Sequence, residues 1–223
     1  MIIAAGAFAD EPFFASQKGM VLTTAFLNNK GKTERFIRMT INDVRGSEAD
    51  MTIDYTMEML DGNHRPAGKA GIREYSVTVT GGILEIKPDD MMDLFFASRN
   101  MNYKLTSGTL SVPSNMTSGS RIEDSWMNMT VRIPVVGEVT ANTMITNIRC
   151  IGIETVTVPA GTFEACKVTM TSTTEIKGRT RSPITSNSTT WYVRGIGPVK
   201  SINVDGRGRI GSTIELFELN PKT

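Results

Sequence analysis

The chain has 223 residues, with 24 Lys and Arg against 23 Asp and Glu, and it contains one His, two Cys, 14 Met and 28 Thr. A net charge of +1 argues against a nucleic-acid-binding protein or a polybasic membrane-surface module, since both carry a strong basic excess. With His64 as the sole His, Ser–His, Cys–His and multi-His metal chemistry are disfavoured, and no cofactor is expected.

The N-terminus resembles the end of an export signal. Residues 2–9 are mostly apolar, and Ala7-Phe8-Ala9 has the small-x-small pattern that precedes a signal-peptidase cut. We interpret residues 1–9 as the remnant of such a signal, with an ordinary apolar segment as the alternative. No stretch approaches the roughly 18 apolar residues of a membrane-spanning helix. The signal-like pattern at 7–9 therefore predicts export to the periplasm or cell surface.

Apolar and polar residues alternate along most of the chain. Period-2 alternation is typical of strands with one buried and one solvent-facing side, as in antiparallel sheets. Thr fills many polar positions, where its β-branched side chain suits a pleated surface. In chain order, the apolar positions are Ile37, Met39 and Ile41; Met51, Ile53, Tyr55, Met57 and Met59; Tyr75, Val77 and Val79; Met127, Met129, Val131 and Ile133; and Cys166, Val168 and Met170.

Turn-forming residues separate these runs, at 28–31, 61–63, 81–82, 176–178 and 205–206. The short spacing indicates that consecutive strands pair as hairpins. The predicted fold is therefore all-β, an antiparallel meander curled into a barrel or half-barrel. We expect residues 10–223 to form one domain, with a division into two lobes near residue 105 as the alternative.

One segment breaks the alternation and predicts a short helix near residues 89–98. Met91, Leu94 and Phe95 have helical spacing, and Asp89 is a suitable N-cap. The acids at 89, 90 and 93 also have the D-D-x-x-D spacing of some magnesium–diphosphate sites. Such enzymes are long all-helical chains, so we favour solvated acids at a helix start, where the helix dipole stabilises them.

The two cysteines, Cys150 and Cys166, flank a turn at 158–161. A disulfide between them would close a loop of about 15 residues, which is worth about 3 kcal/mol in the chain-entropy model. A simple two-residue turn at Pro159-Ala160 would not place the two cysteines opposite each other. A disulfide and two buried free thiols therefore both remain open.

Residues 206–211 match the G-x-G-x-x-G dinucleotide motif letter for letter. That motif needs a helix directly after it, because the helix N-terminus holds the pyrophosphate. Here the following residues, Ser212–Phe217, have the pattern of a strand. We therefore interpret the segment as a glycine-rich hairpin.

Methionine is abundant on the apolar faces of the predicted strands. Because Met adapts to varied apolar surfaces, these positions predict either a soft core or a groove for a lipid-like ligand. The candidate ligand face consists of Met51, Tyr55, Met57, Met127, Met129 and Met170.

Three further segments, 112–120, 152–168 and 191–201, contain V-P-S-N, V-P-A-G-T-F and W-Y-V-R-G-I-G-P-V-K in that order. Together they resemble exported β-proteins of unknown function from Bacteroides-type bacteria, including those labelled TapB-like. The resemblance covers roughly residues 105–220 and implies an all-β envelope protein with a curved or barrel-like sheet. It brings no catalytic residues. Lipoprotein members carry an N-terminal Cys for lipid attachment, and this sequence has none there.

The same motifs also predict local structure. Pro159 and Gly161 favour a turn with Phe163 packing just after it. Gly195 and Gly197 favour a bulge or sharp bend, which Trp191 and Tyr192 enter on opposite faces of a strand.

Three functions follow as hypotheses. The first is a non-enzymatic envelope module for binding or assembly, with a lipid-like molecule or an envelope protein as its partner. The second is a structural or adhesion component of the cell surface. The third is a hydrolase that uses two carboxylates brought together by the fold. The lack of a recognisable catalytic constellation favours a non-enzyme.

Overall fold

The computed structural model describes residues 11–47, 49–67, 71–87, 89–98, 101–133, 135–177 and 182–220. The proposed signal remnant at 1–9 lies outside this range. The elements in chain order are β1 (Val21–Asn28), β2 (Thr33–Gly46), β3 (Met51–Asp61), β4 (Ile72–Thr80), β5 (Ile83–Ile86), α1 (Asp89–Ser98), β6 (Asn102–Ser107), β7 (Leu110–Pro113), β8 (Ser125–Ile133), β9 (Gly137–Val158), β10 (Gly161–Ile176), β11 (Ile184–Val193), β12 (Gly197–Asp205) and β13 (Ile210–Asn220).

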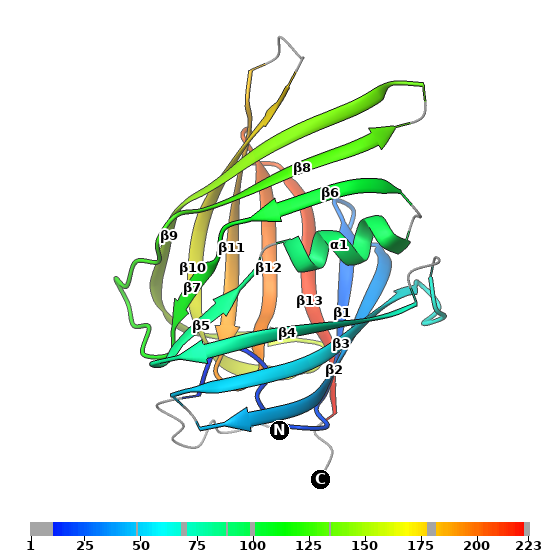
Figure 1. Cartoon of the computed structure of the whole chain (residues 1–223). Coiled ribbons are helices and arrows are strands. Elements are labelled where there is room, and N and C mark those ends of the chain that lie inside the picture. The colour runs from blue at the N-terminus through cyan, green and yellow to red at the C-terminus, as the bar shows by residue number, and fades with distance from the viewer. Residues whose placement is uncertain are drawn as a thin grey trace.

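The thirteen strands of the described residues belong to one antiparallel sheet, in the order β6-β8-β9-β10-β11-β12-β13-β1-β2-β3-β4-β5-β7. Most neighbours are consecutive in sequence, as in a meander, and the first and last strands pair in the middle of the sheet. The sheet is strongly curved around α1 but is not closed by hydrogen bonds (Figure 1). The predicted fold class and the predicted helix at 89–98 are confirmed.

The alternation in sequence becomes alternation in burial. On β3 each odd-numbered residue from Met51 to Met59 is buried and each even-numbered residue is only partly buried. The threonines of the outer positions form cross-strand hydroxyl contacts, such as Thr130–Thr140 at 3.0 Å and Thr143–Thr174 at 2.9 Å. Such pairs each add a fraction of a kcal/mol, roughly 0.2–1, to a sheet. The abundance of Thr therefore reflects the construction of the sheet.

The two edge strands, β6 and β7, follow each other in the chain although they lie at opposite ends of the sheet. The segment after β7 then runs alongside β9. The Gly119 and Ile122 amides donate to the carbonyl oxygens of Cys150 and Ile148, at 2.8 and 2.9 Å. The chain therefore crosses from one edge of the sheet to the other between β6 and β7. Helix α1 lies between β6 and β4 (Figure 1).

The N-terminal segment before β1 fills the lower end of the concave side in the view of Figure 1. Phe13, Phe14 and Ala15 are all buried in the main core cluster. The Phe14 ring lies 5.2 Å from the Tyr55 ring, and the Phe13 ring lies 6.4 Å from that of Tyr192. This end of the interior is therefore occupied by side chains of the chain itself.

Candidate functional site

Helix α1 is held to the sheet by hydrogen bonds from tyrosines to its aspartates. The Tyr55 hydroxyl donates to Asp90 at 3.3 Å. Asp93 accepts from two hydroxyls, that of Tyr75 at 3.0 Å and that of Tyr103 at 2.6 Å. Tyr75 lies on β4 and Tyr103 on the edge strand β6, so Asp93 joins two parts of the sheet that share no ladder. Asp90 and Asp93 of the D-D-x-x-D pattern thus accept hydrogen bonds that attach the helix to the sheet.

The tyrosines of this cluster are harder to ionise than free tyrosine. Burial is the largest cause of the raised pKa of Tyr55, Tyr75 and Tyr103. The neighbouring carboxylates of Asp90 and Asp93 add to it, because a negative charge opposes formation of a second one. The three tyrosines of this cluster therefore act as neutral hydroxyl donors over the physiological pH range.

An apolar pocket of about 150 Å³ lies between α1 and the concave side of the sheet. Its walls are Phe26, Arg35, Ile37, Met59, Met92 and Phe95. The four sheet residues form two cross-strand pairs, because Phe26 faces Arg35 and Ile37 faces Met59. The helix supplies Met92 and Phe95 from the opposite wall. The pocket is therefore assembled from three strands and the helix.

Among the described residues that line this pocket, Arg35 alone has a charged side chain. Its guanidinium lies 5.2 Å from the centre of the Phe26 ring and 5.0 Å from that of Phe95. Stacking on aromatic faces attracts a cation and keeps its planar group in place. The volume matches cavities of about 150 Å³ that hold one benzene molecule, and it is below the roughly 300 Å³ of ordinary ligand sites. The pocket accommodates a ring or the end of an alkyl chain.

The residues of the predicted ligand face lie on three different strands. Met51, Tyr55 and Met57 of β3 are buried in the main core cluster, and Met170 of β10 is partly buried against it. Met127 and Met129 lie partly buried on β8. None of the six lines the apolar pocket. Three residues of the pocket, Ile37, Met59 and Phe95, lie at positions that the alternation and the helical spacing predict to be apolar.

The two cysteines lie side by side on β9 and β10 because of a bulge. The hairpin starts with Val158 opposite Gly161, and that register would place Cys150 and Cys166 on different faces of the sheet. The register shifts by one residue between Lys167 and Val168, so Cys150 faces Val168 and both cysteines point into the core. Their Cα atoms are 6.2 Å apart, inside the range of about 4.4–6.8 Å found for disulfides.

The disulfide stays a prediction, and a thiol count tests it. After oxidative expression and denaturation without reductant, we expect alkylation to label neither Cys150 nor Cys166, and to label both once a reductant is added. Replacing both by Ala should cost about 3 kcal/mol of unfolding free energy in the chain-entropy model. Two labelled cysteines before reduction, measured by mass spectrometry, would contradict the bond.

The V-P-A-G-T-F segment forms the β9–β10 hairpin. Gly161 has a positive φ of 150°, and the buried Phe163 ring packs next to it. Pro159 occupies the turn between the strands. The Ala160 amide donates to the Leu216 carbonyl oxygen of β13 at 3.2 Å, which joins this turn to a distant strand.

The second motif contacts the N-terminal segment. A bulge lies between Trp191 and Tyr192. The turn that follows contains Gly195, and Gly197 begins β12, with φ values of 68° and 98°. The Gly195 amide donates to the Pro12 carbonyl oxygen at 2.8 Å. A Cβ atom on Gly197 would lie 3.4 Å from the backbone of Phe14. Both glycines thus leave room for residues 11–15 to pass.

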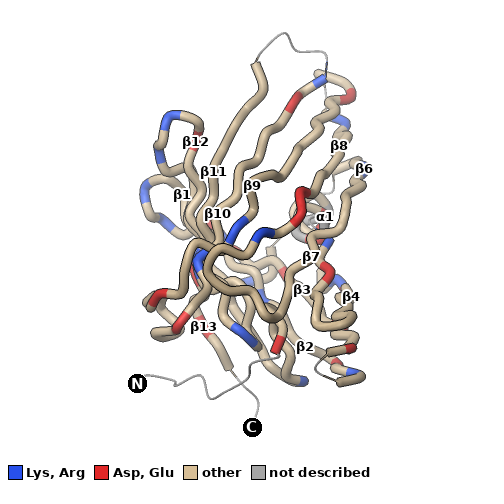
Figure 2. Tube along the Cα trace, turned by 90° about the vertical axis from the view of Figure 1, so that its left-hand side faces the viewer, with Lys and Arg blue, Asp and Glu red and all other residues tan. Residues whose placement is uncertain are grey.

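The G-x-G-x-x-G match at 206–211 lies in a hairpin. These residues form the tip of the β12–β13 hairpin and the start of β13, as predicted for a glycine-rich hairpin. Figure 2 shows Lys and Arg at this tip and at the tip of the β1–β2 hairpin. The His64 ring stacks on Phe36 at 3.9 Å on the side of the sheet away from the main core. Within the described ranges there is no group of three metal-ligating side chains and no helix long and apolar enough to cross a membrane.

The model of the DUF3108-like family matches residues 17–216, from the segment before β1 to within β13. The chain belongs to the DUF3108-like family. The match covers nearly the whole sheet, including the three segments that resemble exported Bacteroides-type proteins. A comparison with curated proteins gives no match. The finer TapB-like label stays a prediction.

Two solved structures share the fold of this DUF3108-like chain. One is a candidate exported protein with a YmcC-like fold from Bacteroides fragilis, with 17% identity and a TM-score of 0.75 over 95% of this chain and 100% of that chain. The other is a candidate lipoprotein from Parabacteroides distasonis, with 16% identity and a TM-score of 0.77 over 94% of this chain and 99% of that chain. At these identities the likeness concerns the fold.

Proposed function

We propose that the protein is a non-enzymatic binding module of the cell envelope that holds the alkyl end of an anionic amphiphile. The observation that carries this proposal is the apolar pocket between α1 and the sheet, with Arg35 in its wall. The pocket offers an apolar surface to a chain and a positive charge to an acidic head group. Met59 and Met92 provide adaptable walls, because Met side chains change shape at little cost.

An envelope location agrees with several independent features. The N-terminal Ala7-Phe8-Ala9 pattern is typical of a signal-peptidase site. The two structural neighbours are a candidate exported protein and a candidate lipoprotein. The adjacent Cys150 and Cys166 suit an oxidising compartment, where disulfides persist. The partner would then be a lipid-like molecule of the envelope.

The carboxylates with a displaced pKa do not support the hydrolase hypothesis. A general acid in such an enzyme needs a raised pKa. Five carboxyls instead have a pKa below the usual range, chiefly because each accepts hydrogen bonds from cations, backbone amides or an indole. These are Asp43, Asp54, Asp61, Glu154 and Asp205.

Calorimetry with two single-chain amphiphiles tests the proposal. Decanoate and decyltrimethylammonium carry similar alkyl chains and opposite charges, so we expect the protein to bind decanoate more tightly. Met92→Trp fills the pocket from the helix side and should weaken decanoate binding about tenfold or more, because the chain loses its apolar contacts. Arg35→Gln should remove the preference for the anion while leaving some binding of both probes.

Two control variants match these changes. Met144→Trp enlarges a Met that is 48% exposed on β9, and Arg38→Gln removes an exposed charge from the opposite face of β2. Both should bind decanoate like the unmodified protein. Equal binding of the two probes, or equal effects of the two Trp variants, would contradict the proposal. Self-association in light scattering without probe binding would favour the structural or adhesion alternative.

A further inference from the structure

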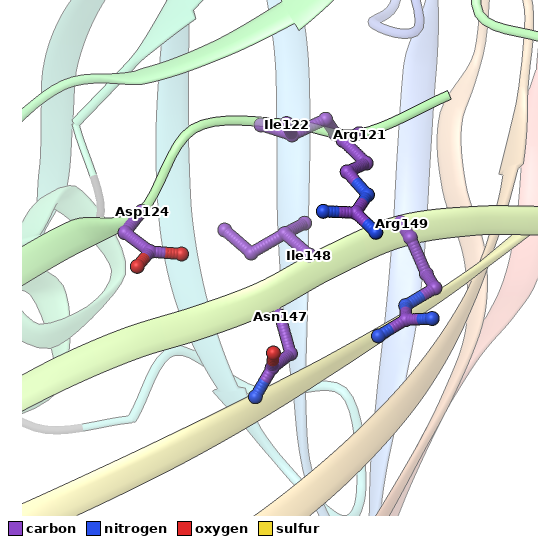
Figure 3. A pocket seen from close by; sticks show the side chains of 6 residues that line it. All are labelled: Arg121, Ile122, Asp124, Asn147, Ile148 and Arg149. Carbon is purple, nitrogen blue, oxygen red and sulfur yellow. The ribbon is translucent and has the colours of Figure 1, made fainter. Parts of the chain in front are cut away.

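A second pocket lies on β9, apart from the helix. Its volume is about 210 Å³. Figure 3 shows its lining, which consists of Arg121, Ile122, Asp124, Asn147, Ile148 and Arg149. Ile122 and Ile148 are 7% and 2% exposed and belong to the main core, whereas the four polar side chains are exposed. The pocket is therefore a polar site next to the core.

The two arginines face each other as a cross-strand pair. Arg121 and Arg149 form an isolated antiparallel bridge between the segment after β7 and strand β9. Backbone hydrogen bonds fix this bridge on both sides. The Ile122 amide donates to Ile148 at 2.9 Å, and the Cys150 amide donates to Ser120 at 2.9 Å. The positions of both Cα atoms are thus set by the fold, and the pair does not depend on a flexible loop.

Like charges directly opposite each other destabilise a sheet. A protein usually compensates such a pair with a carboxylate, but within the described parts of the chain neither Arg121 nor Arg149 has a carboxylate oxygen within 4.0 Å. Figure 3 shows the two guanidinium groups on one side of the pocket and Asp124 on the other. Each guanidinium group carries five N–H donors, and the described parts of the chain offer the two groups no carboxylate within salt-bridge distance.

Asn147 adds a second unusual feature to the same pocket. It has a left-handed backbone conformation with φ 55°, which a residue with a side chain adopts at a cost of about 1–3 kcal/mol. The register of β9 with β10 shifts at this point, because Thr169 faces Arg149 while Thr171 faces Thr146. This bulge brings the Asn147 amide to the pocket beside Arg149 (Figure 3). Bulges of this kind re-aim side chains near functional sites.

We propose that this pocket binds the phosphate of a small phosphoester, with Arg121 and Arg149 as its donors and Asp124 facing a cationic substituent. Guanidinium groups match phosphate oxygens with paired hydrogen bonds, and the anion removes the repulsion between the two arginines. The carboxylate of Asp124 opposes a second anionic group but attracts an ammonium group. The preferred ligand is therefore zwitterionic, either as a free phosphoester or as a lipid head group.

Calorimetry at low ionic strength with inorganic phosphate and phosphoethanolamine tests the proposal on the full chain. We expect saturable binding of both, with phosphoethanolamine tighter. Arg149→Gln should weaken binding of both probes about tenfold, the equivalent of one charge-assisted contact. Asp124→Asn should strengthen the binding of inorganic phosphate and remove the preference for phosphoethanolamine. An unchanged preference in Asp124→Asn would overturn the role of the carboxylate.

Arg207→Gln is the matched control, because Arg207 is an exposed arginine on the β12–β13 hairpin. If Arg207→Gln weakens phosphate binding as much as Arg149→Gln does, binding is non-specific and the proposal is wrong. The proposal is also wrong if neither probe shows saturable binding. Arg149→Gln should unfold at the same temperature or higher without ligand, since it relieves repulsion, so lost binding is not lost folding. If the protein pellets with phosphatidylethanolamine vesicles and Arg149→Gln abolishes the pelleting, the ligand is a lipid head group. If only soluble phosphoethanolamine binds, the ligand is a free phosphoester.

Discussion

Titration with base is expected to produce much less tyrosinate at pH 10 in the folded protein than in the unfolded chain, whose tyrosines ionise near pH 10. All four tyrosines of the chain have a raised pKa. For Tyr192, burial raises the pKa to about 12. For the other three, the carboxylates of α1 add to the effect of burial. Near-ultraviolet absorbance measures the number of ionised tyrosines directly.

The same shifts make stability depend on pH at the alkaline end. The folded tyrosines hold their protons more tightly than the unfolded ones, so base favours the unfolded chain. This contribution to stability is complete below about pH 10 and is lost as the pH rises through the folded pKa values. For Tyr192 the shift from 10 to about 12 corresponds to about 3 kcal/mol.

The contribution of the tyrosines should therefore leave the urea midpoint level between about pH 7 and pH 10 and make it fall steeply above pH 10. The chain denatured in urea provides the reference, with all four tyrosines ionising near pH 10. Asp93→Asn should lower the pKa of Tyr75 and Tyr103 but not that of Tyr192, whose shift is due to burial alone. Two or more tyrosines that ionise near pH 10 while circular dichroism shows folded protein would contradict this prediction.

The fold was predictable because its signals are local. On β3 the alternation between Met51 and Met59 specifies the buried face without knowledge of any partner strand. The helix was equally readable, since its apolar spacing and its first-turn acids lie within ten residues. The partners of Asp93 were not readable, because Tyr75 and Tyr103 meet it only through the curvature of the sheet.

The apolar pocket depends on register, which the sequence does not specify. Arg35 occupies an inward position opposite Phe26, although by composition alone it reads as a solvent-facing residue. The bulges have the same effect on β9. One residue of shift places both cysteines in the core, and a second shift occurs at Asn147, which lines the same pocket as Arg121 and Arg149. A single extra residue exchanges the two faces of a strand, so alternation alone predicts strands more reliably than sites.

Asp93→Ala is expected to lower the free energy of unfolding by about 4 kcal/mol, because it removes the shared acceptor of two tyrosine hydroxyls. Hydrogen bonds to a charged group contribute about 1.5–3 kcal/mol each, and partial exposure of the carboxylate reduces the sum. The loss also separates β4 from β6, which no ladder hydrogen bond joins. Urea unfolding measured by circular dichroism gives the difference directly.

Three variants separate this effect from a general loss of charge. Asp43→Ala removes an aspartate that pairs with Lys18 and Arg45 on an exposed face, and it should change stability little. Tyr103→Phe should cost about half as much as Asp93→Ala, since one of the two hydroxyls still has its acceptor. Combining Asp93→Ala with Tyr103→Phe should cost no more than Asp93→Ala alone, because the hydroxyl lost in the second change has already lost its acceptor. Additive losses would mean that Tyr103 and Asp93 act independently, and the two parts of the sheet would then be held together by packing around α1.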